Sequence, residues 1–467
     1  MIKKLIYLFL KDNNKIIFID SKKSYTCKEF KEKIFFFKNQ FTAIWSKNNT
    51  NKGVAILLDR NVNYFAVIFA VWLSNGYYLP LSKKNTKKNN NYQIKKSGIS
   101  IVVTDIEKNI VVKKRKTLRH KKFLNLSYII FTSGSTGKKK GVMISNKSFI
   151  SYLKNIKNNV NNIKPKSILI NGEITFDIVN ADIVFALINK SRICITENPK
   201  NLFSLISLLK ASKSDSLYCV PTTWENIIYF SKSLNQKYNF LKYAISGGEQ
   251  LSKKTYDNIK KIAPNAKIFN FYGPTEFTIN VSFAELNIKN INKNELIDNN
   301  NNFAIGRIFP SIKYKILNKN KSNEGELFLS GKQMMSGYVN SKKNNFYKIN
   351  NKYYYNTGDI VKKNIHNVLF FIGRKKDYIK YKGYRINLQN ISNHIKKNLK
   401  KNCVIKIINN NIIAYFEKTK KLSKLEINKI TNQLEEYEKP NKIVYLKKFP
   451  LLSNGKIDHN KIGKNFE

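Results

Sequence analysis

The sequence YIIFTSGSTGKKKGVMISNKS, residues 128–148, is the most informative part of the chain, because an apolar strand runs directly into a loop of Gly, Ser, Thr and Lys. This composition predicts a binding loop for a polyphosphate such as ATP, because it combines hydroxyl side chains, glycines with unshielded backbone N–H groups and a lysine. These residues are Thr132, Ser133, Gly134, Ser135, Thr136, Gly137, Lys140 and Gly141. The GxxxxGK[ST] spacing of the P-loop NTPases is absent. A basic surface loop is the alternative, which the flanking apolar runs disfavour.

Composition indicates a folded protein of about two to four domains, since the 467 residues are 42% hydrophobic and 13% aromatic. No stretch reaches the roughly 18 apolar residues that a membrane helix needs. The apolar run at the start is cut off at Lys11, too early for a secretory signal, so we expect a cytoplasmic protein. The cysteines are isolated, without zinc-site spacing, and we expect buried, reduced thiols. They are Cys27, Cys194, Cys219 and Cys403.

The formal net charge of +55 raises the question of nucleic-acid binding. However, the lysines are spread along the whole chain among Asn and Ile and form no basic stripe or arm, so we expect no specific nucleic-acid partner. Because no apolar stretch is long enough for a membrane helix, we also expect no membrane partner. A basic surface would still attract acidic partners, including ATP and acidic carrier proteins.

Short apolar runs alternate with helix-length segments over the first two thirds of the chain, which predicts an α/β domain with mostly parallel strands. The expected strands are 54–58, 77–81, 99–105, 167–170, 191–195, 216–220, 242–246 and 267–271. A helix is expected over 63–76, with Gly76 as its cap. The polar segments 83–96 and 287–302 are expected to be loops.

The remainder of the chain predicts two smaller parts. After Ile305 the strand-rich runs 325–331 and 353–372 indicate an antiparallel subdomain. Strands at 403–408, 411–416 and 442–446 indicate a small α+β domain at the C-terminus. We therefore expect a large domain over residues 1–373 and a small, mobile lid over residues 374–467.

Further polar motifs follow predicted strands. NFYGPTEFTIN, residues 270–280, combines aromatic rings with the hydroxyl of Thr275 and the carboxylate of Glu276. YYYNTGD ends in Asp359, a carboxylate suited to a ribose diol, although Thr-Gly-Asp alone would be a turn. Arg374 precedes the expected domain boundary, and Lys456 follows an Asn-Gly turn on the expected lid.

Taken in order, eight such motifs resemble those of the adenylate-forming enzymes, a superfamily of acyl-CoA synthetases, luciferases, nonribosomal-peptide adenylation domains and D-alanine carrier-protein ligases. They are YIIFTSGSTGKKKGV, FDIVNADI, ISGGE, NFYGPTE, GELFLSG, YYYNTGD, GRKKDYIKYKGYRI and LLSNGKID. TSGSTG, SGGE and NGKID are most similar to the amino-acid-activating branch.

The resemblance implies roles for individual residues in binding ATP and Mg²⁺. The loop from Thr132 to Gly141, with Lys140, would hold the β- and γ-phosphates. Thr275 would contact the α-phosphate and Glu276 would bind magnesium. Lys456 would bridge the substrate carboxylate and the α-phosphate. The base and ribose would be held by Asn270, Tyr272, Gly248, Glu249, Asp359 and Arg374.

The substrate pocket is also implied by the resemblance. Asp177 matches the aspartate that pairs with the α-amino group of an amino acid, although it could instead be a helix N-cap. The matching pocket wall is mostly apolar, which favours a small or medium, uncharged amino acid. Its residues are Ile178, Ala181, Cys219, Ile245, Gly247, Phe271, Ile279 and Asn280.

The expected function is therefore ATP-dependent formation of an aminoacyl adenylate with release of pyrophosphate. Transfer to the phosphopantetheine thiol of a separate carrier protein would follow, after the lid turns about a pivot near Lys376. We expect a free-standing ligase, because no carrier-like segment follows Lys456. Two alternatives remain, namely a ligase that activates an acyl or fatty acid, and a non-catalytic basic binding protein on the same fold.

Overall fold

The computed structural model divides the chain into two compact units, each described by itself. The first unit comprises residues 1–289, 306–314 and 329–355, and the second comprises residues 290–305, 315–328 and 356–467. The described residues are 1–46, 52–106, 109–114, 125–132, 140–199, 201–286, 293–317, 323–339, 345–375, 378–381, 384–408, 411–417, 421–431, 434, 438–452, 457–459 and 461–463.

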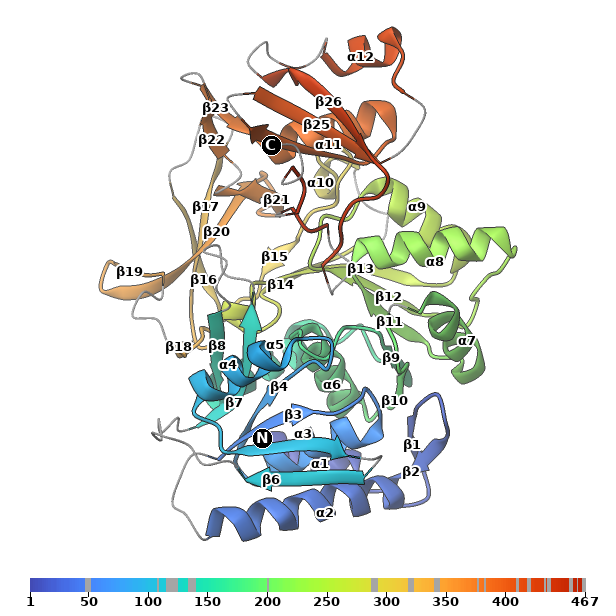
Figure 1. Ribbon diagram of the computed structural model, residues 1–467, viewed down its shortest axis with the longest axis vertical. Helices are drawn as coiled ribbons and strands as arrows, with labels where there is room; N and C mark the ends of the chain where they lie inside the picture. Colours follow the sequence, from blue (N-terminus) through green and yellow to red (C-terminus); the bar gives the residue numbers. More distant parts are fainter. Residues whose placement is uncertain are drawn as a thin grey trace. The chain divides into compact units, whose positions relative to one another are not determined.

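A seven-stranded sheet of the first unit contains β7, the apolar strand that precedes the predicted phosphate loop (Figure 1). Strands β7, β4, β3 and β5 run parallel to one another, whereas β8 is antiparallel to β7 and β6 is antiparallel to β5. In sheet order the strands are β18 (Gly337–Tyr338), β8 (Lys140–Ser145), β7 (Leu126–Thr132), β4 (Tyr77–Pro80), β3 (Gly53–Leu57), β5 (Ile101–Ile106) and β6 (Asn109–Lys114).

A nine-stranded sheet forms the other half of the first unit. Its six central strands, from β13 to β1, are parallel, which confirms the βαβ alternation predicted from the apolar runs. In sheet order the strands are β15 (Arg307–Ile308), β14 (Ser282–Glu285), β13 (Lys267–Tyr272), β12 (Tyr243–Gly247), β11 (Ser216–Cys219), β9 (Ser167–Ile170), β10 (Arg192–Ile195), β1 (Ile16–Ile19) and β2 (Ser24–Thr26).

Helices α5 (Asn146–Asn159) and α6 (Ile178–Asn189) connect the two sheets of the first unit. α6 packs on β9 and β10 of the larger sheet, while α5 packs on β7 and β8 of the smaller one and against α6. Every residue of α6 from Val179 to Leu187 is buried, as expected for a helix between two layers. The Tyr78 hydroxyl of β4 donates to the Asn180 side chain of α6 at 2.6 Å.

Apolar and amphipathic helices cover the remaining faces of the first unit. Every residue of α3 from Tyr64 to Leu73 is buried, which explains the unbroken apolar sequence of this stretch. The helices are α1 (Ile2–Phe9), α2 (Cys27–Ser46), α3 (Val62–Leu73), α7 (Leu202–Ser212), α8 (Pro221–Ser233) and α9 (Lys253–Ile262).

Two local predictions for the first unit are wrong. The segment 83–96 was expected to be a loop, but much of it belongs to helix α4 (Lys87–Ser97). The Thr86 hydroxyl accepts from the Asn89 N–H, and α4 buries Asn90, Gln93 and Ile94, so polar residues here pack inward.

The predicted cap of α3 is also wrong. α3 ends at Leu73, and Asn75, with φ of 57°, takes the left-handed conformation expected of Gly76. Gly76 is instead required by close approach, because a Cβ there would lie 2.6 Å from the Lys52 carbonyl oxygen.

A five-stranded sheet contains β16 (Lys313–Leu317), β17 (Glu324–Ser330), β20 (Lys352–Lys363), β19 (Phe346–Ile349) and β21 (Leu369–Arg374). The chain passes from one unit to the other within β16, β17 and β20. β20 runs antiparallel to β19 and to β21, as predicted for this strand-rich region. The short helix α10 (Lys293–Leu296) precedes it, in a segment expected to be a loop.

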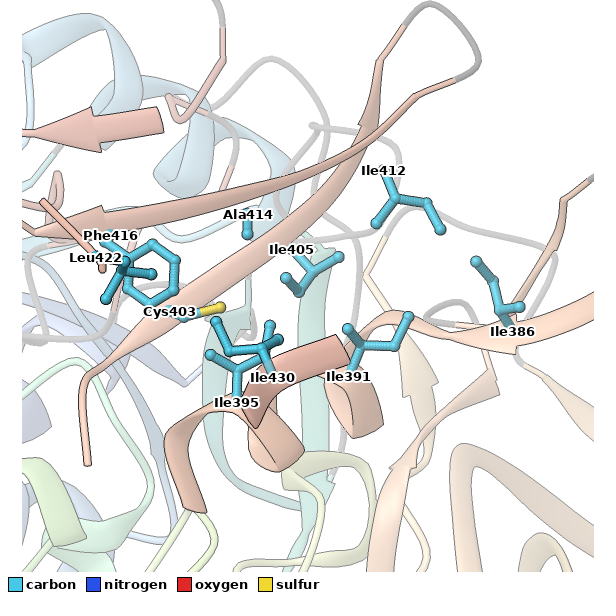
Figure 2. Close-up of a cluster of buried hydrophobic side chains, with 10 residues drawn as sticks. All are labelled: Ile386, Ile391, Ile395, Cys403, Ile405, Ile412, Ala414, Phe416, Leu422 and Ile430. Atoms are coloured by element: carbon cyan, nitrogen blue, oxygen red, sulfur yellow. The ribbon is translucent and has the colours of Figure 1, made fainter. Parts of the chain in front are cut away.

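The C-terminal part of the second unit has its own hydrophobic core. Figure 2 shows Ile391 and Ile395 of α11 clustered with Cys403 and Ile405 of β24 and with Ile430 of α12. The predicted strands at 403–408, 411–416 and 442–446 are confirmed. The elements are β22 (Tyr378–Tyr381), β23 (Tyr384–Asn387), α11 (Leu388–Leu399), β24 (Cys403–Ile408), β25 (Asn411–Glu417), α12 (Lys424–Thr431) and β26 (Lys442–Leu446).

This separate core is compatible with a C-terminal domain, and the expected boundary at residue 374 stays a prediction. All four cysteines are buried free thiols, as expected. Within the described ranges, the helices are too short or too polar for any of them to span a bilayer.

Candidate active site

The carboxyl ends of the parallel strands bring the predicted residues of three motifs to one end of the nine-stranded sheet. Asp177 follows β9, Cys219 ends β11, Gly247 ends β12, and Tyr272 ends β13. In open α/β sheets, ligands bind where parallel strands end. The topology therefore places the FDIVNADI, ISGGE and NFYGPTE motifs together.

The phosphate loop of the prediction lies between β7 and β8. Thr132 ends β7, Lys140 begins β8, and the two residues are paired across the strands. The Lys140 ammonium lies 5.2 Å from the centroid of the Tyr338 ring, within cation–π range. The remaining predicted loop residues, Ser133, Gly134, Ser135, Thr136 and Gly137, lie outside the described residues.

The predicted magnesium ligand Glu276 is held by the same tyrosine. Thr275 and Glu276 lie on the 3₁₀ turn η1 (Thr275–Phe277), and one Glu276 carboxylate oxygen accepts from the Tyr338 hydroxyl at 2.9 Å. The Met335 N–H donates to the Glu276 carbonyl, also at 2.9 Å. Burial, followed by the charge of Glu276, raises the pKa of Tyr338, so this phenol remains a donor. Tyr338 thus joins Lys140 to Glu276, a link that the sequence did not reveal.

Asp177, at the start of α6, has an unusual environment. It occupies the N-cap position with a helical backbone and makes no side-chain cap hydrogen bond. Its carboxylate does accept from the Ile178 N–H at the start of α6, and the roles as helix cap and as substrate ligand both stay predictions. Burial raises the pKa of Asp177 to about 6. The Thr275 hydroxyl opposes this shift by hydrogen bonding, while the negative charge of Glu276 adds to it. Among the described residues, Asp177 has no ion-pair partner.

Side chains of α3 and of the residue before its N-cap hold the loop that leads into Asp177. The buried Arg60 guanidinium donates to the backbone carbonyls of Ile170, Gly172 and Thr196. Tyr64 donates to the Ile174 carbonyl at 3.2 Å. Burial lowers the pKa of Arg60 to about 10, which leaves the guanidinium protonated at neutral pH. These bonds satisfy carbonyls at the ends of β9 and β10 and so fix the approach to α6.

Several predicted pocket residues converge on Tyr218 of β11. A Cβ at Gly247 would lie 2.7 Å from both the Tyr218 hydroxyl and the Phe271 carbonyl, so this position needs glycine. The Phe271 ring lies 5.9 Å from that of Tyr218, and the Asn280 amide donates to the Tyr218 hydroxyl at 3.1 Å. Sequence reasoning missed Tyr218, because only the folded sheet brings these residues together.

The other predicted pocket residues lie on the same elements. Cys219 accepts weakly from the Asn171 amide at 3.6 Å, and burial raises the pKa of the Cys219 thiol, which therefore stays protonated. Ala181 and Ile245 are fully buried, Ile279 follows η1, and Ile178 is half-buried at the first turn of α6.

The SGGE turn lies beside the start of α8. A Glu249 carboxylate oxygen accepts from the Thr222 N–H at 3.1 Å and from its hydroxyl. Gly248 has φ of 78°, a left-handed conformation that favours glycine. Asn270 is buried on β13, and Tyr272, at the end of that strand, is half-buried.

The two predicted ribose-binding residues meet in the second unit. Asp359 and Arg374 are paired across β20 and β21, and the Arg374 Nε lies 3.0 Å from an Asp359 carboxylate oxygen. The aspartate side chain is 2% exposed, whereas that of the arginine is 51% exposed. Within Thr-Gly-Asp, Gly358 has φ of 70° and the Thr357 hydroxyl accepts from the Asp359 N–H, while the register of β20 shifts between Ile360 and Val361. The predicted catalytic Lys456 and the predicted pivot Lys376 lie outside the described residues.

The side chains of the first unit fit magnesium held jointly with a nucleotide. Mg²⁺ in phosphoryl-transfer sites commonly takes one or two carboxylates and completes its shell with phosphate oxygens and water. Glu276 supplies such a carboxylate, already oriented by Tyr338. Over the part of the chain that the structure describes, no group of three or more His, Cys, Asp or Glu residues forms a metal site without phosphate.

A cavity of about 430 Å³ lies at the opposite end of the nine-stranded sheet, where the strands begin. Its cations include Lys15, which donates to the Lys190 carbonyl, and Arg192, which donates to the Ser212 carbonyl. Its acid Asp215 accepts from the backbone of Lys166 and Ser167. These contacts satisfy helix ends and strand starts, and none of the predicted site residues lines this cavity.

Comparisons with known proteins agree on the family. The sequence model described as AMP-binding enzyme matches residues 10–339. The Dapdiamide synthesis protein DdaD of Enterobacter agglomerans is 26% identical over 400 residues, which are 82% of this chain and 66% of DdaD. A D-alanine–D-alanyl carrier protein ligase of Listeria monocytogenes serotype 4b is 31% identical over 363 residues, which are 71% of this chain and 68% of that ligase.

The fold comparison covers nearly the whole chain. The crystal structure of IdnL7 matches with a TM-score of 0.82 at 16% identity, over 98% of this chain and 97% of IdnL7. This match shows a shared fold that includes the C-terminal part, where the family match has ended. The chain spans just under two thirds of the length of DdaD.

Proposed function

The chain belongs to the AMP-binding enzyme family, as the resemblance of its motifs predicted, and we propose that it is an ATP-dependent ligase that activates the carboxylate of an amino acid. The observation that carries the amino-acid part of this proposal is Asp177. It is a carboxylate with a raised pKa, beside Thr275 and Glu276, and it has no cation partner among the described residues. The ammonium group of an amino acid would supply that missing positive charge.

The proposed first step needs no nucleophile from the protein. A carboxylate oxygen of the substrate attacks the α-phosphorus of ATP, the bond to the pyrophosphate oxygen breaks, and an aminoacyl adenylate and pyrophosphate result. The protein has to align two anions and neutralise the charge that develops between them. Lys140, Thr275 and Lys456 are the proposed donors, and Glu276 would hold the magnesium ion that offsets phosphate charge.

The proposed second step transfers the acyl group to a thiol. The sulfur of a phosphopantetheine group attacks the acyl carbonyl, the bond to the AMP oxygen breaks, and a thioester, AMP and a proton are formed. We propose that the acceptor is a separate carrier protein and that the C-terminal lid turns about residue 376 between the steps. The D-alanyl carrier protein named for the Listeria relative supports a carrier of this type.

The proposed substrate is a small or medium amino acid without a charged side chain. The predicted wall contains buried apolar residues, and the polar groups of Cys219 and Asn280 are already engaged by Asn171 and Tyr218. A charged substrate side chain would meet no opposite charge on this wall and would lose its hydration.

Amino-acid-dependent exchange between ATP and labelled pyrophosphate tests the proposal. Wild-type protein should exchange label with at least one uncharged amino acid, and Lys456→Ala should lower the rate on the order of 100-fold, because a group that stabilises the transition-state charge is lost. Lys461→Ala, a lysine on the same segment, is the matched control and should keep the wild-type rate. Absence of exchange with every amino acid tested would refute the proposal.

Two other functions predict different results in this assay. A ligase for acyl or fatty acids would exchange label with acids that lack an α-amine and would tolerate Asp177→Ala. A non-catalytic basic binding protein would show neither exchange nor nucleotide affinity, and it would bind RNA in a salt-sensitive manner.

A further inference from the structure

The turn that follows η1 has a backbone conformation that its residues do not favour. Thr278 has φ of 59° and Ile279 has φ of 71°, both in the left-handed region. β-Branched side chains rarely adopt this region, because their Cβ substituents crowd the backbone. Such a conformation persists only where surrounding contacts determine it, and residues of this kind gather at functional sites.

One buried side chain, Gln333, supplies those contacts. Its amide nitrogen lies 3.1 Å from the Phe277 carbonyl oxygen, 3.3 Å from that of Thr278 and 3.0 Å from that of Asn280. The Thr278 hydroxyl donates to the Gln333 backbone carbonyl at 2.5 Å. Gln333 is 0% exposed, so water does not compete for these bonds. The bonds surround Ile279 on both sides along the chain.

The orientation of the Gln333 amide is itself determined. Its side-chain oxygen accepts from the Asn155 amide of α5 at 2.5 Å. The Asn155 oxygen in turn accepts from the Ser311 hydroxyl at 2.8 Å. This chain of donors leaves the Gln333 nitrogen, and not its oxygen, facing the turn.

The turn also packs closely on the GPTE segment. A Cβ at Gly273 would lie 2.2 Å from the Ile279 carbonyl oxygen and 2.7 Å from the Asn280 Cα. The Asn280 side-chain amide in turn donates a hydrogen bond to the Tyr218 hydroxyl. A change in the Ile279 backbone would therefore move two residues of the predicted pocket wall.

We propose that Gln333 is a positioning residue that holds Ile279 in its left-handed conformation and thereby sets the selectivity of the pocket among amino-acid side chains. The inference rests on the proposed function, because it concerns the choice of amino acid. Gln333 belongs to none of the predicted motifs. It is separated in sequence by 53 to 56 residues from the residues of the turn that it contacts.

Gln333→Met tests this role, since methionine has a similar volume and no amide. We expect the preference for the best amino acid over its homologue with one more methylene to fall about tenfold, because such pockets discriminate a methylene by roughly 10- to 200-fold. The KM for ATP should stay within twofold. Gln93→Met is the matched control, because Gln93 is a buried glutamine of α4 in the same unit. It should keep wild-type selectivity even if its melting temperature falls.

Two further variants separate positioning from general stability. Ile279→Gly removes the crowding, so Gln333→Met should lower the melting temperature less in that background than in the wild type. Asn155→Ala leaves Gln333 in place but frees its amide, and it should shift selectivity in the same direction by a smaller factor. Asn155→Ala also keeps the test available if Gln333→Met does not fold.

The outcomes distinguish the inference from the proposed function. Unchanged selectivity in Gln333→Met and Asn155→Ala, with active wild-type protein, would overturn the inference alone. An equal loss of selectivity in Gln93→Met would also overturn it, since the effect would then be general. Wild-type protein without amino-acid-dependent exchange would refute the proposed function instead.

Discussion

Two carboxylates of this protein, Asp177 in the first unit and Asp359 in the second, differ in the partner that the fold gives them. Asp359 lies 3.0 Å from the Arg374 guanidinium on the neighbouring strand. Asp177 has the hydroxyl of Thr275 nearby but no cation among the described residues, and its pKa is raised to about 6. The chain has 85 Lys and Arg residues, so cations are not scarce.

These surroundings determine what each carboxylate can do before a ligand binds. Asp359 has its charge compensated within the protein, so it can offer a fixed oxygen to a neutral hydroxyl group. Asp177 bears an uncompensated charge at a cost in stability, and a cationic ligand would remove that cost. We therefore interpret the Asp359 region as an already ordered binding element and the Asp177 region as a cation-selective site.

Replacement of Asp177 should give the largest effect. Asp177→Ala is expected to lower kcat/KM for the amino acid on the order of 1000-fold, because loss of one partner leaves the substrate ammonium buried without its charge. The KM for ATP should change little. Steady-state pyrophosphate exchange at saturating ATP measures the effect.

The matched control keeps the shape of the side chain. Asp177→Asn should lose nearly as much activity as Asp177→Ala if the charge is what matters. Activity close to wild type in the asparagine variant would show that the side chain acts by hydrogen bonding. The proposed difference from Asp359, an uncompensated charge at Asp177, would then have no role in substrate binding.

Replacement of Arg374 should give a smaller effect, and it should act on the KM for ATP and not on that for the amino acid. Arg374→Met leaves Asp359 buried without its cation and removes a predicted ribose contact, so we expect the KM for ATP to rise about tenfold. The KM for the amino acid should stay unchanged. The free energy of unfolding should fall by only about 1 kcal/mol, because the arginine is half exposed and solvent screens the pair. A rise in the amino-acid KM instead would contradict the separation of roles.

The pH dependence should show the smallest effect over the physiological range. Below its pKa of about 6, Asp177 is protonated in the free enzyme, so kcat/KM for the amino acid should fall about tenfold per pH unit below pH 6. The free energy of unfolding should change in the opposite direction with pH. Because the folded-state pKa is raised from 3.8, the folded protein loses stability relative to Asp177→Asn as pH rises from about 4 to 6. Thermal unfolding of both proteins across this window measures it.

Much of the fold could be predicted from local patterns in the sequence. Buried parallel strands consist of short apolar runs, and the runs at 167–170, 216–220 and 267–271 correspond to β9, β11 and β13. The segment 83–96 was mistaken for a loop because its polarity hides a helix whose inward face carries Asn90 and Gln93. Side-chain hydrogen bonds at Thr86 and Asn90, which composition does not reveal, stabilise α4.

Within the candidate site, only residues that belong to recognisable sequence motifs could be predicted. Residues such as Glu276 and Asp177 belong to recognisable strings, whereas Tyr338, Tyr218 and Gln333 act through contacts far apart in sequence. Tyr338 bonds Glu276 across 62 residues, and a single sequence gives no sign of which tyrosine makes that contact. The left-handed conformation of Ile279 could not be predicted either, because nothing in the local sequence FTIN, residues 277–280, favours it.

Selection by Asp177 of a substrate with an α-amine can be tested in one paired measurement. Pyrophosphate exchange by wild-type protein is compared for the best amino acid and for the same acid without its amine, at equal concentrations and saturating ATP. We predict exchange with the amino acid and a rate on the order of 1000-fold lower with the deaminated acid. Equal rates with both acids would contradict the claim.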